Sequence, residues 1–85
     1  MQYRIINRDV TQNPHDVFQL VTEYKNGIRE KQDYISFGPA LIAFTEKGKA
    51  FTADDLAQLS AFYIVKINYP AREAVYIVEL YLGED

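Results

Sequence analysis

The sequence predicts an α+β fold: a small antiparallel sheet of about four to five strands, with one main helix at about residues 53–61 packed on one face. Two observations predict it. Near the C-terminus, two runs rich in β-branched and aromatic residues, 62–69 and 74–82, flank a Pro-containing turn. Before them, Thr52 precedes a pair of aspartates, a pattern typical of a helix N-terminus. The length of 85 residues suits one α+β domain, 1–85.

The two C-terminal runs alternate as the strands of a hairpin, 62–69/74–82, should. In the first run, one set of alternate positions is entirely apolar or aromatic: Tyr63, Val65, Ile67 and Tyr69. In the second run, the corresponding set is Tyr76, Val78, Leu80 and Leu82. Each strand therefore has one apolar and one mixed face, as expected of an antiparallel sheet that is covered on one side.

The earlier segments give weaker signals. Residues 2–10 alternate as a strand and end at an Asn-Pro turn, residues 11–14. Residues 28–37 are polar in the middle, which favours a solvated or edge strand. The apolar run 40–44 then predicts one or two helical turns, which Gly48 would end.

Residues 15–25 allow two interpretations. The spacing of the apolar side chains fits a helical stripe that Asn13 could cap. The same segment is rich in β-branched and aromatic residues, and Asn26-Gly27 is the preferred sequence of a two-residue type I′ turn. A strand that feeds a hairpin at this turn is slightly favoured, and the helix stays open as the alternative.

Composition limits both chemistry and location. The absence of cysteine excludes disulfides, thiol catalysis and thiolate metal sites, and it favours a reducing cytoplasm. No apolar stretch approaches the roughly 20 residues of a membrane helix. The first residues lack the apolar run of a signal peptide. Because the formal charge is −3, nucleic acid is not the expected partner unless bases cluster on one face.

Few residues could carry chemistry. His15 is the only histidine and follows a proline in a turn, so we expect an exposed side chain and not a catalytic base. Asp54 and Asp55 are neighbours, and neighbours on a helix point about 100° apart. They should therefore complement the helix N-terminus instead of converging on a metal ion. We predict no enzymatic activity, no metal site and no cofactor.

Two alternative functions belong to other classes. The first is a single-stranded nucleic-acid platform of bases and stacking rings. Its candidate residues are Arg4, Arg8, Arg29, Lys31, Lys66, Tyr3, Tyr34 and Tyr63. The second is a small enzyme or ligand-binding subunit whose site is completed at a dimer interface. It requires a polar pocket that contains His15 or buried carboxylates.

The leading hypothesis is a non-enzymatic protein-binding module that presents an aromatic sheet face or edge. The predicted surface consists of the hairpin tyrosines and one turn residue: Tyr63, Tyr69, Arg72, Tyr76 and Tyr81. Strand edges in so short a chain need cover, so a homodimer is expected. An inhibitor or adaptor of the kind that phages and mobile elements carry would suit the size and the acidity.

Overall fold

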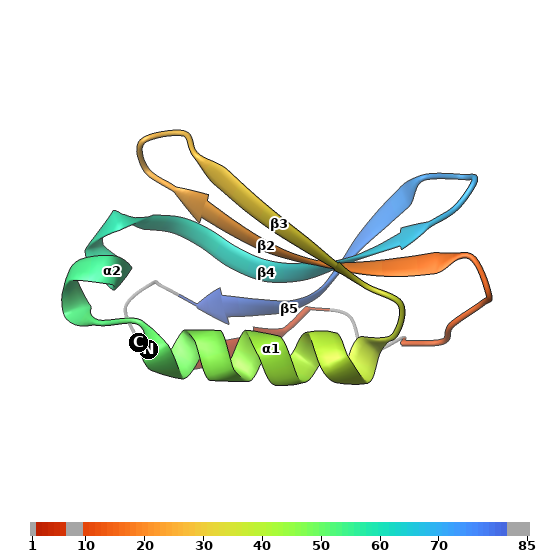
Figure 1. Cartoon of the computed structure of the whole chain (residues 1–85), viewed down its shortest axis with the longest axis horizontal. Coiled ribbons are helices and arrows are strands. Elements are labelled where there is room, and N and C mark those ends of the chain that lie inside the picture. Colours follow the sequence, from red (N-terminus) through yellow and green to blue (C-terminus); the bar gives the residue numbers. More distant parts are fainter. Residues whose placement is uncertain (1, 7–9, 82–85) are drawn as a thin grey trace.

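The computed structural model describes residues 2–6 and 10–81 and, within them, the side chains of residues 4–6 and 10–80. The elements in chain order are β1 (Gln2–Ile5), β2 (Asp16–Tyr24), β3 (Arg29–Tyr34), α1 (Phe37–Ala50), α2 (Ala53–Gln58), β4 (Leu59–Asn68) and β5 (Glu73–Tyr81). Figure 1 shows the strands as one strongly twisted sheet, with α1 lying along one side of it and α2 at the corner that leads into β4.

All strand pairs are antiparallel, and the strand order is β1-β5-β4-β2-β3. The predicted α+β fold is therefore confirmed. The C-terminal hairpin is confirmed as well, with Asn68 opposite Glu73 next to its turn. The single face predicted for Tyr76 and Val78 is wrong, because the register shifts between Ile64 and Val65, so that Val78 lies opposite Ile64 and Tyr76 opposite Val65. The N-terminal strand predicted over 2–10 is shorter, because β1 ends at Ile5, and residues 7–9 of that range lie outside the described part of the chain.

The middle strand, β4, is buried on both of its faces. Phe62 and Ile64 point toward α1 and are fully buried in the principal core. Tyr63 and Val65 point the opposite way and are buried against Val21 of β2, in a second and smaller apolar cluster. Alternation along a strand produces these two sets. We call the side of the sheet opposite α1 the helix-free face.

α1 covers the sheet mainly through aromatic rings. Phe44 stacks on Phe62, with ring centroids 4.7 Å apart and planes inclined by 7°. Phe51 meets the same ring edge-on, with centroids 5.0 Å apart. Ala40, Phe44 and Gly48, spaced four residues apart, form the buried inner stripe of the helix. The principal core therefore depends on Phe62, which lies between two rings.

The position of the main helix differs from the prediction. It is α1, whereas the sequence pattern indicated about 53–61 and allowed only one or two turns around 40–44. Pro39 lies in the first turn of α1, where a proline costs no helical hydrogen bond. Gly48 does not end the helix, because it is buried on the inner stripe. Packing on the sheet outweighs the roughly 1 kcal/mol that an internal glycine costs.

α2 begins where the sequence predicted but is shorter. The backbone N–H of Asp55 donates to Thr52 Oγ1 at 3.1 Å, and the N–H of Thr52 donates to Asp55 Oδ2 at 3.0 Å. This capping box confirms Thr52 as the N-cap. The helix ends at Gln58 because the next residue, Leu59, is buried in the core as the first residue of β4.

Residues 16–24 form β2, so the hairpin interpretation of this segment is confirmed and the helix is excluded. The turn differs in length from the prediction. Tyr24 N–H donates to the Ile28 carbonyl at 2.9 Å, and Gly27 N–H donates to the Tyr24 carbonyl at 3.0 Å. Gly27 has a φ of 92°, whereas Asn26 has no positive φ. A type I′ turn requires two positive φ values, so the loop is a three-residue connection that places its glycine last.

A buried ion pair ties the segment before β2 to β4. Asp16 Oδ2 lies 3.6 Å from the Lys66 ammonium and accepts the backbone N–H of Asn13 at 2.9 Å. The same ammonium donates to the carbonyl of Thr11. Because the Asp16 side chain is only 1% exposed, these contacts take the place of the water that an exposed carboxylate would bind.

Removal of the ring between Phe44 and Phe51 should destabilise the whole domain. We expect Phe62→Ala to lower the free energy of unfolding by about 3–5 kcal/mol, because it deletes a fully buried ring and leaves a cavity. Urea unfolding followed by circular dichroism measures this loss. Ile42→Ala, on the outer side of α1 and 60% exposed, is the control and should change stability by less than about 0.5 kcal/mol.

Removing only the cation of the buried Asp16–Lys66 pair should lower the free energy of unfolding more than removing both charges. Lys66→Met leaves the Asp16 carboxylate buried without its cation, so we expect a loss of about 3 kcal/mol. Adding Asp16→Asn should recover part of that loss, since the amide oxygen can still accept from Asn13. Urea unfolding of both single variants and the double variant gives the coupling. Strictly additive losses would contradict this role of the pair.

Candidate functional site

The helix-free face brings together most of the residues that the sequence assigns to an interaction surface. Cross-strand pairing places Tyr63 opposite Glu79 of β5 and Val21 of β2, and Val65 opposite Tyr76 of β5. α1 lies on the other side of the sheet (Figure 1). The centre of this face is thus an aromatic and aliphatic strip built by β5, β4 and β2.

Tyr63 is a structural residue of this face. It is 9% exposed, its hydroxyl donates to Glu23 Oε1 at 3.2 Å, and its ring meets the Tyr76 ring at 4.7 Å with a 67° inclination. Burial raises the pKa of the Tyr63 hydroxyl above its ordinary value of 10.0, and the negative charge of Glu23 adds to the shift. Tyr63 is therefore mostly hidden from solvent, and its ring supports the ring of Tyr76.

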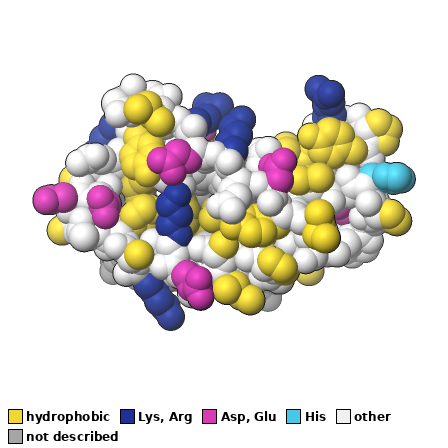
Figure 2. Space-filling model, in the orientation of Figure 1, with side chains coloured by type: hydrophobic (Ala, Val, Ile, Leu, Met, Phe, Trp, Pro, Cys, Tyr) yellow, Lys and Arg dark blue, Asp and Glu magenta, His cyan; other side chains and the backbone are white. Residues whose placement is uncertain are grey.

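The exposed aromatic surface lies toward the far end of the β4–β5 hairpin. Tyr76 is 49% exposed and Tyr69, directly after β4, is 41% exposed. Arg72, in the turn between the strands, is exposed and has a positive φ of 56°. Figure 2 shows hydrophobic side chains gathered at this upper right end of the molecule. We call Tyr69, Arg72 and Tyr76 the hairpin patch; the side chain of Tyr81 lies outside the described residues.

Two ion pairs border the aromatic strip. Arg4 of β1 lies 2.9 Å from Glu79, and Arg29 of β3 lies 2.8 Å from Glu23. Exposed pairs of this kind contribute only about 0–1 kcal/mol to stability. Their main effect here is electrostatic, since each arginine neutralises a carboxylate that would otherwise stand beside the tyrosine rings.

The remaining candidates for chemistry have structural contacts. His15 is exposed; its carbonyl accepts the Tyr69 N–H at 3.4 Å, and its own N–H donates to Asn13 Oδ1 at 2.9 Å. Asp55 belongs to the capping box of α2. Within residues 2–6 and 10–81, no group of three or more His, Cys, Asp or Glu side chains could hold a metal ion.

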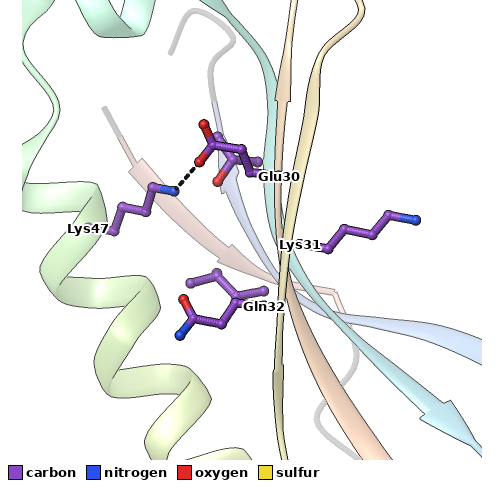
Figure 3. A pocket seen from close by; sticks show the side chains of 6 residues that line it. Glu30, Lys31, Gln32 and Lys47 are labelled. Carbon is purple, nitrogen blue, oxygen red and sulfur yellow. Dashed lines mark hydrogen bonds and ion pairs between the residues drawn. The ribbon is translucent and has the colours of Figure 1, made fainter.

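Sequence reasoning missed two hollows, because both arise where segments distant in sequence meet. The first, of about 100 Å³, lies between α1 and β3 and is lined by Leu20, Thr22, Glu30, Lys31, Gln32 and Lys47. Figure 3 shows Lys47 reaching toward Glu30, 3.3 Å away, whereas Lys31 points to the other side of the sheet. The second, of about 360 Å³, is lined by Tyr24, Lys25, Asn26, Ala57 and Gln58.

Tyr24 lines the second hollow and is, with Tyr63, one of two tyrosines among the described side chains whose hydroxyl pKa is perturbed. Burial raises the pKa of Tyr24, and the negative charges of Glu30 and then Asp55 add to the shift. The first hollow is well below the roughly 300 Å³ of ordinary ligand pockets. The second is open and lies against the polar β2–β3 turn, so neither enclosed volume nor converging functional groups mark it as a ligand site.

The bases and rings considered for a nucleic-acid platform divide between the two faces of the sheet, with Arg4, Arg29, Lys31 and Tyr63 on the helix-free face. Lys66 lies on the helix side, in the buried ion pair, and Tyr34 packs against the principal core. Both arginines that border the aromatic strip are paired with carboxylates. Lys31 is exposed on the helix-free face. Arg8 and the side chain of Tyr3 lie outside the described residues.

Comparisons with protein-family models, with curated proteins and with solved structures found no match to this chain. Among the described residues, no helix is long and apolar enough to cross a membrane.

Tyr63 should make stability pH-dependent in the alkaline range. Its pKa is raised on folding, so the stabilisation is complete below the unfolded value near 10 and is lost as the pH rises above it. We expect the free energy of unfolding to fall less steeply above pH 10 in Tyr63→Phe than in the wild type. At pH 7 the same variant should lose only about 1 kcal/mol, the contribution of one hydrogen bond.

Urea titrations at several pH values measure both effects. Glu23→Gln is the second variant, because removal of the carboxylate charge should also reduce the alkaline slope. Identical slopes in wild type and Tyr63→Phe would contradict the buried, protonated hydroxyl.

Proposed function

We propose that this chain is a small, non-enzymatic protein-binding module of the cytoplasm that contacts its partner through the hairpin patch. The observation that carries the proposal is the exposure of Tyr69 and Tyr76, 41% and 49%, beside the exposed Arg72 at one end of the sheet. Tyrosine and arginine are, with tryptophan, the residue types enriched at the energetic centres of protein interfaces.

The contacts beneath the hairpin patch support this role. The Tyr76 ring packs against Tyr63, whose hydroxyl is fixed by Glu23. A side chain that is ordered before binding loses little rotamer freedom when a partner covers it, so more of the contact energy appears as affinity. The aromatic pair therefore offers a partner an exposed ring in a fixed orientation.

Three of the carboxylates that could serve acid–base chemistry are engaged in maintaining the fold. Asp55 caps α2, the carboxylate of Asp16 is paired with Lys66, and Glu23 accepts the hydroxyl of Tyr63. This allocation favours a binding role over a catalytic one. An inhibitor or adaptor of the phage or mobile-element type fits a compact, acidic domain whose exposed aromatic residues lie at one end.

Differential capture tests the proposal. Wild-type protein and Tyr69→Ser/Tyr76→Ser are immobilised and exposed to extract from the source cells, and retained proteins are quantified by mass spectrometry. We expect one protein or complex to be retained by the wild type and reduced by about tenfold or more with the double variant, since each interface tyrosine commonly contributes about 1–2 kcal/mol.

The control is Ile28→Ser/Ile42→Ser, which removes two apolar side chains that are 56% and 60% exposed and lie away from the hairpin patch. It should retain the partner as the wild type does. A set of captured proteins that responds equally to both double variants would show nonspecific adhesion and contradict the assignment. Circular dichroism of each variant verifies that the fold is retained.

A further inference from the structure

β3 forms one edge of the sheet, and in the described structure it pairs only with β2. Tyr24 N–H donates to the Ile28 carbonyl, and the register carries this pattern to the even-numbered residues of β3. The odd-numbered residues Arg29, Lys31 and Asp33 therefore direct their backbone N–H and C=O groups outward, away from β2. This edge can accept another strand.

Two charges on this edge lack an ionic partner among the described residues. Arg29 and Glu30 form ion pairs with side chains of β2 and α1. Lys31 and Asp33 form none, although Asp33 Oδ1 accepts a hydrogen bond from the amide of Gln19 at 2.9 Å. The two have opposite sign, lie two residues apart and point to the same face of the sheet.

We propose that the outer edge of β3 pairs antiparallel with the β3 edge of a second copy of this chain. The two-fold axis passes at Gln32, so that Lys31 of each copy lies opposite Asp33 of the other. Both residues are at outward-directed backbone positions, so the register matches hydrogen-bonding pairs as an antiparallel ladder requires. Roughly four backbone hydrogen bonds and two ion pairs would form across the axis.

The charges select this register over its neighbours. A shift of the two-fold axis to Asp33 places two carboxylates opposite each other. A shift to Lys31 places two ammonium groups opposite each other; it also sets Asp33 opposite Arg29, but that guanidinium is already paired with Glu23. Like charges directly opposite are destabilising, whereas opposite charges contribute favourably. Registers between these match an outward residue with an inward one and break the ladder.

The same register covers an apolar residue that the single chain leaves in water. Ile35, which follows β3 directly, is 91% exposed. In the proposed pair it lies opposite Arg29 of the second copy, whose aliphatic stem can pack against it. Edge charges commonly prevent strand pairing, but here their order makes the edge complementary to itself.

The pairing has a consequence for the binding surface without depending on it. β3 is separated from β5 by β2 and β4, so the hairpin patch of each copy stays remote from the new interface. The paired molecule would carry both patches on one continuous sheet. A partner with two matching sites would then bind with an effective concentration term that a single chain cannot supply.

Charge exchange tests this inference without a partner. Sedimentation velocity over a concentration series should show self-association of the wild type. Lys31→Glu and Asp33→Lys, each alone, place like charges opposite each other twice, so we expect roughly tenfold or greater weakening of association. An equimolar mixture of the two variants restores opposite charges at every pair, and we expect it to form a heterodimer of wild-type affinity.

Lys49→Glu and Asp54→Lys provide the matched control, because they change net charge identically at exposed positions outside β3. Each should associate as the wild type does, and mixing them should add nothing. A wild type that is monomeric throughout the series, or single variants that associate like the wild type, would overturn the inference. Failure of the mixture to associate would also overturn it. None of these outcomes bears on partner capture by the hairpin patch.

Discussion

The structure depends on a central strand, β4, whose residues must be buried on both faces although α1 packs on only one of them. On the helix side, Phe62 is enclosed by aromatic rings from α1 and the segment after it. On the other side the neighbouring residue is Tyr63. Its ring can be buried without a covering helix because its hydroxyl can still reach a hydrogen-bond acceptor at the border of the face. The ring is shielded by β2, β5 and Tyr76, while the hydroxyl reaches Glu23 at the border of the face.

Short sequence patterns predicted correctly those elements whose formation depends on interactions between residues close in sequence. The strand character of β4 and β5 and the Thr52 cap were predictable, because each is expressed within a few residues. The faces of β5 were not, because the register shift between Ile64 and Val65 places Tyr76 and Val78 on opposite faces. α1 was not, because Pro39 and Gly48 resemble helix ends by themselves and only burial against the sheet makes the helix continue. The turn after β2 shows a similar limit, since a glycine with positive φ fits loops of two or of three residues.

The candidate surface was predictable in composition and not in exposure. Tyr63 and Tyr76 lie on the same face, yet one is buried and the other is half exposed. Along β4 the ring of Tyr63 has a strand on each side, whereas the described pairing of β1 with β5 covers Val78 to Tyr81 and does not include Tyr76. How much of β5 is paired with β1 is a property of the assembled sheet and has no signal in a local sequence pattern. The pairing of Arg4 with Glu79, near opposite ends of the chain, is equally invisible to local patterns.

The balance of charges on the helix-free face limits which kinds of molecule this face can attract. On the described part of the helix-free face, the three bases Arg4, Arg29 and Lys31 are matched by the three acids Glu23, Asp33 and Glu79. The net charge of −3 therefore originates elsewhere, and the face has no excess positive potential to attract a phosphate backbone. Two copies of an acidic chain also repel at long range. Association through β3 would consequently depend on short-range contacts, namely the backbone ladder and the order of charges along the strand, so that exchanging two charges matters more than changing the total.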